Sequence, residues 1–196
     1  MRSRQRWLVV AVVMLAVGPA FAAGNANFLI GGRGLDEDLW DPVDDHSVFG
    51  VTVDFGGAEW PVRIETGFYG SAAEDTVDDA LLGGIDVTLT VAEFFFGVNK
   101  TWTPAGKVRP FVGGGLASVI ADIELDTAFF GGTDDDDQSL GAYVHGGVFW
   151  RLGPKFNIGL DGRVMTGTDL TLFDSETDVD YVQLGLVLGF GWPAAK

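Results

Sequence analysis

The sequence contains no cysteine, and this absence removes several kinds of site at once. A chain without thiols has no disulfide framework, no thiolate nucleophile, no cysteine-ligated zinc and no lipid-modified cysteine anchor. Basic residues are also scarce, with 12 Lys and Arg against 28 Asp and Glu and a formal net charge of −16. Because nucleic-acid phosphates need a clustered positive surface, nucleic acid is excluded as a partner.

Long apolar runs are absent after the first twenty residues, yet the chain is far from polar. Hydrophobic residues make up 47% and aromatic residues 12% of the 196 residues, which is too apolar for a disordered acidic chain. Glycine is also in excess, with 29 residues, or roughly twice the usual share. A folded chain of one domain, or at most two small ones, is expected.

The N-terminal segment is typical of a secretory signal peptide. Arginines at positions 2, 4 and 6 precede an apolar run over 7–17, which ends at Gly18 and Pro19, short of the ~20 residues of a membrane-spanning helix. An Ala-x-Ala site follows at 20–22. We therefore expect residues 1–22 to be cleaved and residues 23–196 to form an outer-membrane β-barrel domain. Its charge would be −19, because cleavage removes three arginines and no acid.

The rest of the chain is dominated by segments of about ten residues in which apolar side chains alternate with small or polar ones. This period of two is that of a β-strand with two different faces. In the last segment the even-numbered residues from Val182 to Trp192 are apolar, and most of the odd-numbered ones are small or polar. Eight strands are predicted, at about 27–35, 49–56, 62–69, 86–102, 108–123, 140–151, 156–164 and 181–192.

One segment departs from this alternation, because Leu89 and Val91 share the parity of Glu93. Two explanations are open. Either the strand contains a β-bulge near Ala92, or its upper half rises beyond the membrane.

The connections between the predicted strands also alternate. Tight Gly- and Pro-containing turns at 56–59, 103–107 and 153–155 join strands two to three, four to five and six to seven. Longer acidic segments, such as 36–45 and 134–137, join the others. One end is thus short and the other elaborated, which predicts an all-β fold, an eight-stranded antiparallel up-and-down transmembrane β-barrel.

The apolar face of this barrel is expected to lie outside, against lipid. A soluble barrel would carry many Lys and Glu on its exterior, whereas the second face here has one or two charges per strand and much Gly, Tyr and Phe, which suits a narrow lumen. Trp102, Trp150, Phe156 and Trp192, near the short turns, match an interfacial girdle. A soluble exported lipocalin-like carrier is the less favoured alternative.

Two segments carry a family likeness, the hairpin formed by 93–102 and 108–116, and the last strand at 183–190. They resemble the small eight-stranded, porin-like outer-membrane barrels of Gram-negative bacteria, the OmpA/OmpX-like outer-membrane β-barrel domain proteins. The resemblance implies outer-membrane localisation among lipid and lipopolysaccharide, with short turns in the periplasm. It also implies a signal for the barrel-assembly machinery, formed by Gln183, Gly185, Leu188 and Phe190.

Charged residues on the second face are expected to meet inside the barrel. Since an unpaired charge is costly in a narrow lumen, opposite charges should pair into a network that fills it. Such a network could serve a gated pore, but a polar core that fixes strand register is favoured, because eight strands leave little bore. The residues are Arg33, Asp54, Arg63, Glu65, Glu93, His145, Arg151, Asp161 and Arg163.

His145 raises the question of catalysis, because some eight-stranded outer-membrane barrels are lipid A deacylases or acyltransferases that use His, Ser and a carboxylate. The deacylase pattern places Ser two residues after the His, where this chain has Gly147. The other histidine, His46, is expected in a loop. No catalytic residue and no cofactor are therefore predicted.

The acidic segments raise the question of a cation site. Neither 134–137 nor 174–180 has the spacing and distal Glu of a dedicated calcium loop, so a solvated acidic surface is expected and no metal. We expect a non-enzymatic integral outer-membrane protein with a structural or surface-interaction role and an unidentified extracellular partner. A narrow cation-preferring channel with an acidic mouth is the runner-up.

Overall fold

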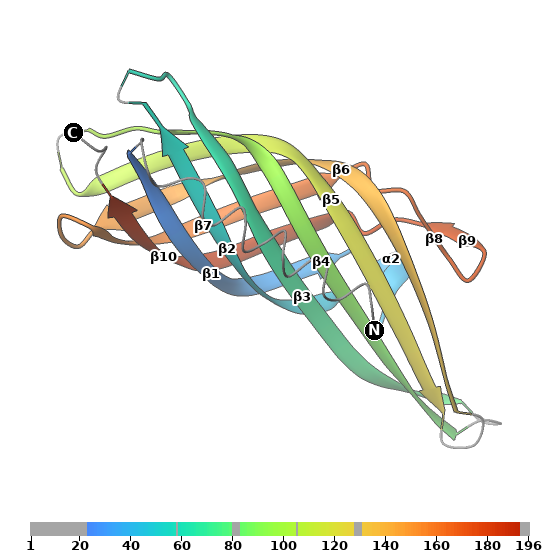
Figure 1. Ribbon diagram of the computed structural model, residues 1–196. Coiled ribbons are helices and arrows are strands. Elements are labelled where there is room, and N and C mark those ends of the chain that lie inside the picture. The colour runs from blue at the N-terminus through green and yellow to red at the C-terminus, as the bar shows by residue number, and fades with distance from the viewer. Residues whose placement is uncertain (1–22, 58, 80–82, 105, 128–130, 193–196) are drawn as a thin grey trace.

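The computed structural model describes residues 23–57, 59–79, 83–104, 106–127 and 131–192 (Figure 1). The predicted signal peptide at 1–22 lies outside these residues, and its cleavage stays a prediction. The strands are β1 (Ala23–Leu35), β2 (Asp45–Gly56), β3 (Arg63–Asp79), β4 (Gly83–Thr101), β5 (Val108–Thr127), β6 (Gly131–Arg151), β7 (Phe156–Thr166), β8 (Leu170–Leu172), β9 (Ser175–Thr177) and β10 (Tyr181–Trp192). Within the described ranges the one helix is the single turn α2 (Glu37–Trp40), and no helix there is long and apolar enough to cross a membrane.

Eight strands close into a barrel in the order β1-β10-β7-β6-β5-β4-β3-β2, and every neighbouring pair is antiparallel. The first and last strands close the ring, with Gly24 opposite Trp192 and Leu35 opposite Tyr181. β8 and β9 form a separate hairpin between β7 and β10. The predicted eight-stranded antiparallel up-and-down barrel is confirmed.

The two faces of each strand differ as the alternation predicts. Along β10, Val182, Leu184 and Leu188 are at least 60% exposed, whereas Tyr181 and Gln183 are at most 3% exposed. A closed barrel with large apolar side chains outside and polar ones inside is suited to lipid, because its outer side chains cannot hydrogen-bond with water. A soluble carrier would have the reverse arrangement, with polar side chains outside and apolar ones inside.

Glycines give the lumen room for aromatic rings. A side chain at Gly50 would collide with the Tyr69 ring, and one at Gly67 would collide with the Phe95 ring. These inward positions therefore require a residue without Cβ. Part of the glycine excess is explained by the need to fit rings inside a narrow barrel.

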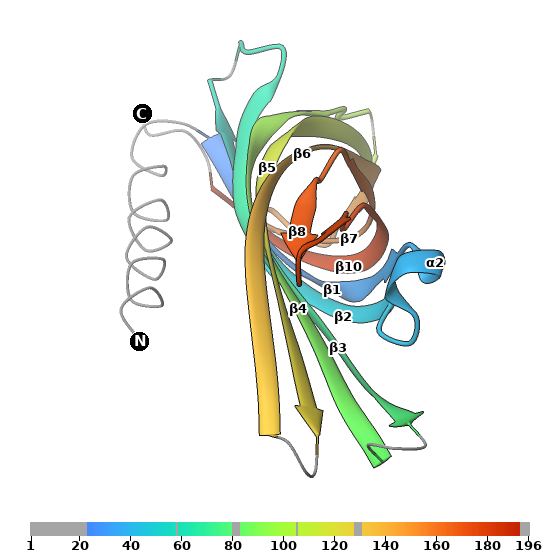
Figure 2. The ribbon, with the colours of Figure 1, turned by 90° about the vertical axis from the view of Figure 1, so that its right-hand side faces the viewer.

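Strands β3 to β6 are longer than the others and continue past the ring as a curved four-stranded sheet (Figure 2). We call this part, residues 73–79, 83–91, 119–127 and 131–141, the extracellular sheet, because the sequence predicts that this end of the barrel faces outward from the cell. β2 pairs with β3 only as far as Ala72, and β7 pairs with β6 only as far as Ala142. The two outer strands of the extracellular sheet therefore run on without the neighbours that close the barrel.

The predicted β-bulge near Ala92 does not occur, because Ala92 pairs in continuous register with Gly70 on one side and Ile120 on the other. Leu89 and Val91 point inward, as Glu93 does, and all three are fully buried. Their shared parity arises because the inner face of β4 turns apolar where the strand enters the extracellular sheet. Of the two explanations, the structure favours a strand whose upper half rises beyond the apolar band.

Two further sequence expectations are corrected. Asp134 to Asp137 lie within β6 and not in a loop, because the strand continues far past the barrel. His46 lies in β2, is 3% exposed and contacts the Ser71 hydroxyl through Nδ1 at 3.2 Å. The acidic end of the molecule is therefore built largely from sheet, which holds its carboxylates in fixed directions.

An apolar core lies on the inner side of the extracellular sheet. Leu89, Val91, Val119 and Ala121 are fully buried there, in one cluster with side chains from the connections that cross the barrel mouth. Those covering residues are Trp40 and Val43 before β2, Leu170 and Leu172 of β8, and Val179 before β10. The connections thus close over the lumen by burying apolar surface.

Candidate functional site in the lumen and the extracellular sheet

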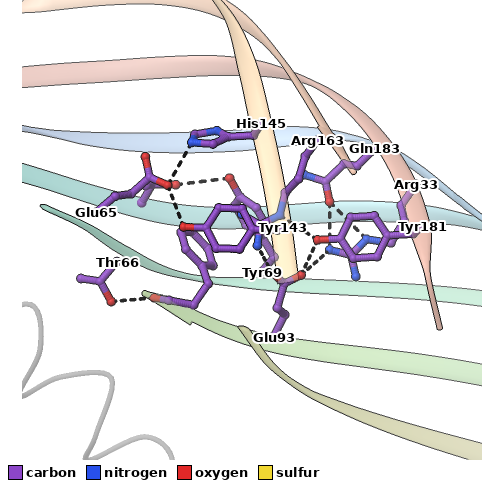
Figure 3. Close-up of polar contacts among 12 residues, drawn as sticks. Arg33, Glu65, Thr66, Tyr69, Glu93, Tyr143, His145, Arg163, Tyr181 and Gln183 are labelled. Atoms are coloured by element: carbon purple, nitrogen blue, oxygen red, sulfur yellow. Dashed lines mark hydrogen bonds and ion pairs between the residues drawn. The ribbon is translucent and has the colours of Figure 1, made fainter. Parts of the chain in front are cut away.

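Glu93 is the centre of the polar network inside the barrel (Figure 3). Its carboxylate accepts hydrogen bonds from Arg33 Nη2 at 3.0 Å, from the Tyr181 hydroxyl at 2.6 Å and from Arg163 Nη2. The side chains of Arg33, Glu93 and Arg163 are 0% exposed. Because they belong to β1, β4 and β7, these bonds link strands across the ring.

Gln183, Ser71 and an aromatic ring hold Arg33 in place. Its Nε and Nη2 donate to Gln183 Oε1 at 3.1 and 2.9 Å, and Nη1 donates to Ser71 Oγ at 3.3 Å. Its guanidinium lies 3.8 Å from the centre of the Tyr181 ring. Every nitrogen of this buried cation therefore has a partner, as the cost of burying a charge requires.

Arg163 is held in a different way, against a group of three rings. Its guanidinium carbon lies 3.7 Å from the ring centre of Tyr143, 4.3 Å from that of Phe95 and 5.0 Å from that of Tyr69. Nε donates to the Tyr181 hydroxyl at 2.8 Å, while Nη1 has no hydrogen-bond partner among the described residues. Cation–π contacts, which are favourable in a desolvated site, therefore stabilise the part of the guanidinium that hydrogen bonds do not reach.

His145 lies between two carboxylates. Its Nδ1 is 2.9 Å from Asp161 Oδ2, and its Nε2 is 3.1 Å from Glu65 Oε1, an ion-pair distance without good hydrogen-bond alignment. Glu65 also accepts from Asn99 Nδ2 at 2.8 Å and from the Tyr143 hydroxyl at 3.2 Å. In the described part of the chain, neither ring nitrogen of His145 hydrogen-bonds a Ser or Thr hydroxyl, so His145 is not paired with a nucleophile of that kind.

The remaining predicted lumen residues lie nearer the short turns. Arg63 Nη1 donates to Asp54 Oδ1 at 2.7 Å, and Asn25 donates to the same carboxylate. Arg151 stands apart, since its guanidinium donates to the carbonyls of Gly153 and Pro154 in the adjacent turn. The structure thus brings eight of the nine predicted residues into three groups of charged contacts and leaves Arg151 outside them.

Sequence reasoning placed Tyr and Phe on the lumen face, but it did not identify their contacts with the charged groups, and it missed one cation of the lumen. Tyr69, Phe95, Tyr143 and Tyr181 are buried against the charged groups, and Arg109 faces the lumen beside Phe149. Strand parity carried the signal for each of them. Arg109, for example, is two residues before the inward-facing Phe111.

The predicted assembly residues occupy both faces of β10. Gln183 and Gly185 point inward, where Gln183 binds Arg33 and Gly185 packs against Leu29. Leu188 and Phe190 point outward and are 60% and 39% exposed. Their recognition by the barrel-assembly machinery stays a prediction, and Gln183 has an additional role in the lumen.

In the extracellular part, Asp180 closes the connection between β7 and β10. Its carboxylate accepts from the amides of Gly167 and Thr168 at 3.0 Å and from the hydroxyls of Thr166 and Thr168 at 2.8 Å. Partial burial would raise the pKa of Asp180, but these four donors outweigh it and hold the pKa below its ordinary value. The carboxylate is a structural element of the connection.

Side chains of β6 pair with the backbone of the β8 segment. The amides of Asp169, Thr171 and Phe173 donate to Ser139 Oγ at 2.9 Å, Asp137 Oδ2 at 2.7 Å and Asp135 Oδ2 at 2.6 Å, respectively. Backbone hydrogen bonds from Thr171 and Gln138 lower the pKa of Asp137. Alternate side chains of β6 therefore hold the β8–β9 hairpin beside a part of β6 that β7 does not pair. The acids of β6 thus have a structural role and are not merely a solvated surface.

The described residues include no group of three His, Cys, Asp or Glu side chains placed to hold a metal ion.

No protein-family model matches the sequence, and neither does any curated protein. Several solved structures are similar to this chain. The outer membrane protein OprG from Pseudomonas aeruginosa has a TM-score of 0.60 and 13% identity, over 90% of this chain and 98% of that one. This is the fold of a small outer-membrane barrel. Ail, the attachment invasion locus protein of Yersinia pestis, in complex with the heparin analogue sucrose octasulfate, has a TM-score of 0.55 and 11% identity, over 89% and 99%. Neisserial surface protein A has a TM-score of 0.55 and 11% identity, over 87% and 97%.

The expected resemblance to OmpA/OmpX-like barrels is confirmed at the level of the fold. The similar chains are matched over nearly their whole length. Low identity shows that different side chains can build this barrel, because the strand pattern and the lipid-facing wall define it.

Proposed function

We propose that this chain is a non-enzymatic integral outer-membrane protein whose extracellular sheet binds an extended polypeptide by strand addition. The observation that carries the proposal is the edge of β3 beyond Ala72, which no other described strand pairs. Such an edge offers a row of backbone N–H and C=O groups to a second chain. The β6 edge is less available, because Asp135 and Asp137 already hold the β8 segment.

Charge defines the partner. Twenty-three of the 28 acidic residues, and no Lys or Arg, lie in the segments 36–45, 74–86, 122–137 and 169–180. The inner face of the extracellular sheet also offers apolar contacts to a partner, because Val77, Ile85 and Leu125 there are partly exposed. A cationic segment with alternating apolar residues fits both features. A polyanion such as the heparin analogue bound by Ail would be repelled by these acidic segments, because both are negatively charged.

The lumen argues for a binding protein over the runner-up, a cation-preferring channel. Arg33, Glu93, Arg163, Tyr69 and Gln183 fill its central level and are at most 2% exposed. Conduction would require buried charge pairs to separate, which is costly. The apolar wall is expected to contact outer-membrane lipid and lipopolysaccharide.

The test shortens one hairpin and leaves the ring intact. Replacing residues 76–86 by Asn-Gly joins Asp75 to Val87, which already face each other, through a two-residue turn. The probe is a synthetic peptide of alternating Lys and Val, titrated against the refolded protein in octyl glucoside. We expect the variant to bind at least about tenfold more weakly, because residues 76–79, more than half of the free β3 edge, are lost.

The matched control shortens the neighbouring hairpin. Replacing residues 126–132 by Asn-Gly joins Leu125 to Thr133, an equivalent facing pair, and spares the β3 edge. This variant should bind the peptide as the wild type does. Equal loss in both variants would show diffuse charge attraction and contradict strand addition, as would wild-type binding after loss of the β3 edge.

A further inference from the structure

The short-turn end of the barrel has the opposite charge to the extracellular sheet. Six basic residues of the described chain lie there, in or next to the turns: Arg63, Lys100, Lys107, Arg109, Arg151 and Lys155. Three of them, the arginines, belong to the inner side of the ring, where field lines are confined by apolar walls. The acids at this end are Asp54, which pairs with Arg63, and Glu59 in the turn between β2 and β3.

A cavity of about 80 Å³ opens among these side chains. It is lined by Arg63 and Arg109, by the amides of Asn25, Asn27 and Asn157, by Thr101 and Thr103, and by the Phe149 ring. All of these side chains except Phe149 can donate a hydrogen bond, and Arg63 and Arg109 add fixed positive charge. Donors that converge on one small cavity are the chemistry of an anion site.

Arg109 is the cation of this group that the protein does not neutralise. Arg63 is paired with Asp54 at 2.7 Å, and Arg151 donates to two turn carbonyls. Among the described residues, Arg109 has no carboxylate or carbonyl partner, and the positive charges of Arg151 and Arg63 act on it unfavourably. An anion placed between Arg109 and Arg63 would relieve this repulsion.

We propose that the mouth at the short-turn end binds a tetrahedral oxyanion of the phosphate class. Arg109 supplies the unneutralised charge and the fork of donors that suits phosphate oxygens. Arg63 supplies a second charge, held in position by Asp54, and Asn157, Thr101 and Thr103 supply neutral donors. The anion is either a free phosphate or the phosphate of a lipid headgroup that reaches the rim.

The experiment titrates inorganic phosphate into the refolded protein by calorimetry in octyl glucoside, a detergent without phosphate. Wild type should show saturable binding, and Arg109→Gln should bind at least about tenfold more weakly, since a charge-assisted fork is lost. Lys155→Gln is the matched control, because it removes one charge from the same end but from the outer wall, where its ammonium lies near the Phe190 ring. It should keep wild-type affinity.

Thr103→Val is the second variant, with a smaller expected loss of about two- to fivefold, and it keeps the proposal testable if Arg109→Gln does not fold. Folding of each variant is checked by the faster migration of the unheated protein on SDS gels. Absence of saturable binding by wild type, or equal weakening by Lys155→Gln and Arg109→Gln, would overturn the proposal.

Repeating the titration in phosphatidylglycerol nanodiscs distinguishes the two sources of phosphate. An affinity for inorganic phosphate that falls in nanodiscs identifies the lipid headgroup as the ligand, because it competes for the same cavity. An unchanged affinity identifies a free anion.

Discussion

Strands β3 to β6 form half of the barrel wall and all of the extracellular sheet, and along β4 and β5 the two faces exchange character. At the level of the barrel, β4 and β5 point Phe96 and Leu116 outward and Glu93 and Phe111 inward. In the extracellular sheet the same two strands point Thr88 and Glu124 outward and the apolar Leu89 and Val119 inward. The inversion happens without any change of register.

This difference shows which constraint belongs to the strand and which to its surroundings. Alternation is a property of the pleated backbone, so inward positions stay inward along the whole strand. Which face is apolar depends on the medium outside. In lipid the apolar face is the outer one, and in water it is the inner one, so the point of inversion marks the expected membrane boundary.

Glu93→Gln should have the largest effect, because it removes the negative partner that Arg33 and Arg163 share. Two buried cations would lose their counter-charge, at a cost of about 3–5 kcal/mol in the free energy of unfolding. The measurement is urea unfolding in detergent, followed by tryptophan fluorescence. Glu124→Gln, on the outer face of the extracellular sheet, is the matched control and should change stability by less than about 0.5 kcal/mol. Similar values for the two would mean that the lumen network does not stabilise the barrel.

Asp180→Ala should have an intermediate and local effect. It removes the acceptor of four hydrogen bonds and should ease opening of the 166–181 connection by about 1–2 kcal/mol. Amide exchange at Gly167 and Thr168 is the measurement, with Glu176→Ala, an exposed acid of the same connection, as the nearby control. Unchanged exchange at both amides would contradict the structural role of this carboxylate.

The same bonds predict a pH dependence. Since the pKa of Asp180 is lowered in the folded state, its stabilisation is complete above the ordinary value of 3.8 and is lost as the pH falls through the lowered pKa. Exchange at Gly167 and Thr168 should therefore rise in wild type below about pH 4. In Asp180→Ala this acid-dependent rise should be absent.

Asp137→Ala should have the smallest effect, limited to the pairing of β6 with the β8 segment. The Thr171 amide loses its acceptor and should exchange faster, while the gel migration of the unheated protein stays unchanged. Asp136→Ala, whose side chain points outward from β6, should leave the Thr171 amide protected. A global loss of folding in Asp137→Ala would show that the hairpin supports the ring, which would weaken the separation between the two regions.

Much of the fold could be predicted because strand parity and turn chemistry are local. Val182 to Phe190 display both faces of a strand within one segment, and the Gly- and Pro-containing turns mark one end of the barrel. The length of the strands could not be predicted in the same way. Asp134 to Asp137 have the composition of a loop, and only their pairing with Ala121 to Glu124 makes them strand.

The candidate sites show the same division. Parity alone placed Glu93 and Arg33 on the lumen side, but it could not say that they meet, since they are 60 residues apart in the sequence. Arg109 was missed although its parity is inward, because its neighbours Pro110 and Phe111 gave no sign that a cation would lack a partner. A partner, or the lack of one, is a property of the closed ring.

The sequence by itself determined the alternation, the asymmetry of the turns and the excess of acid, because each depends on residues adjacent in the chain. The tertiary structure decided which charges neutralise one another, which strand edge is left unpaired and which cation is left over. Those outcomes depend on closure of β1 against β10 and on where β2 and β7 end. Ring closure brings residues from distant strands within hydrogen-bond distance, and the early ends of two strands leave the others to form the extracellular sheet.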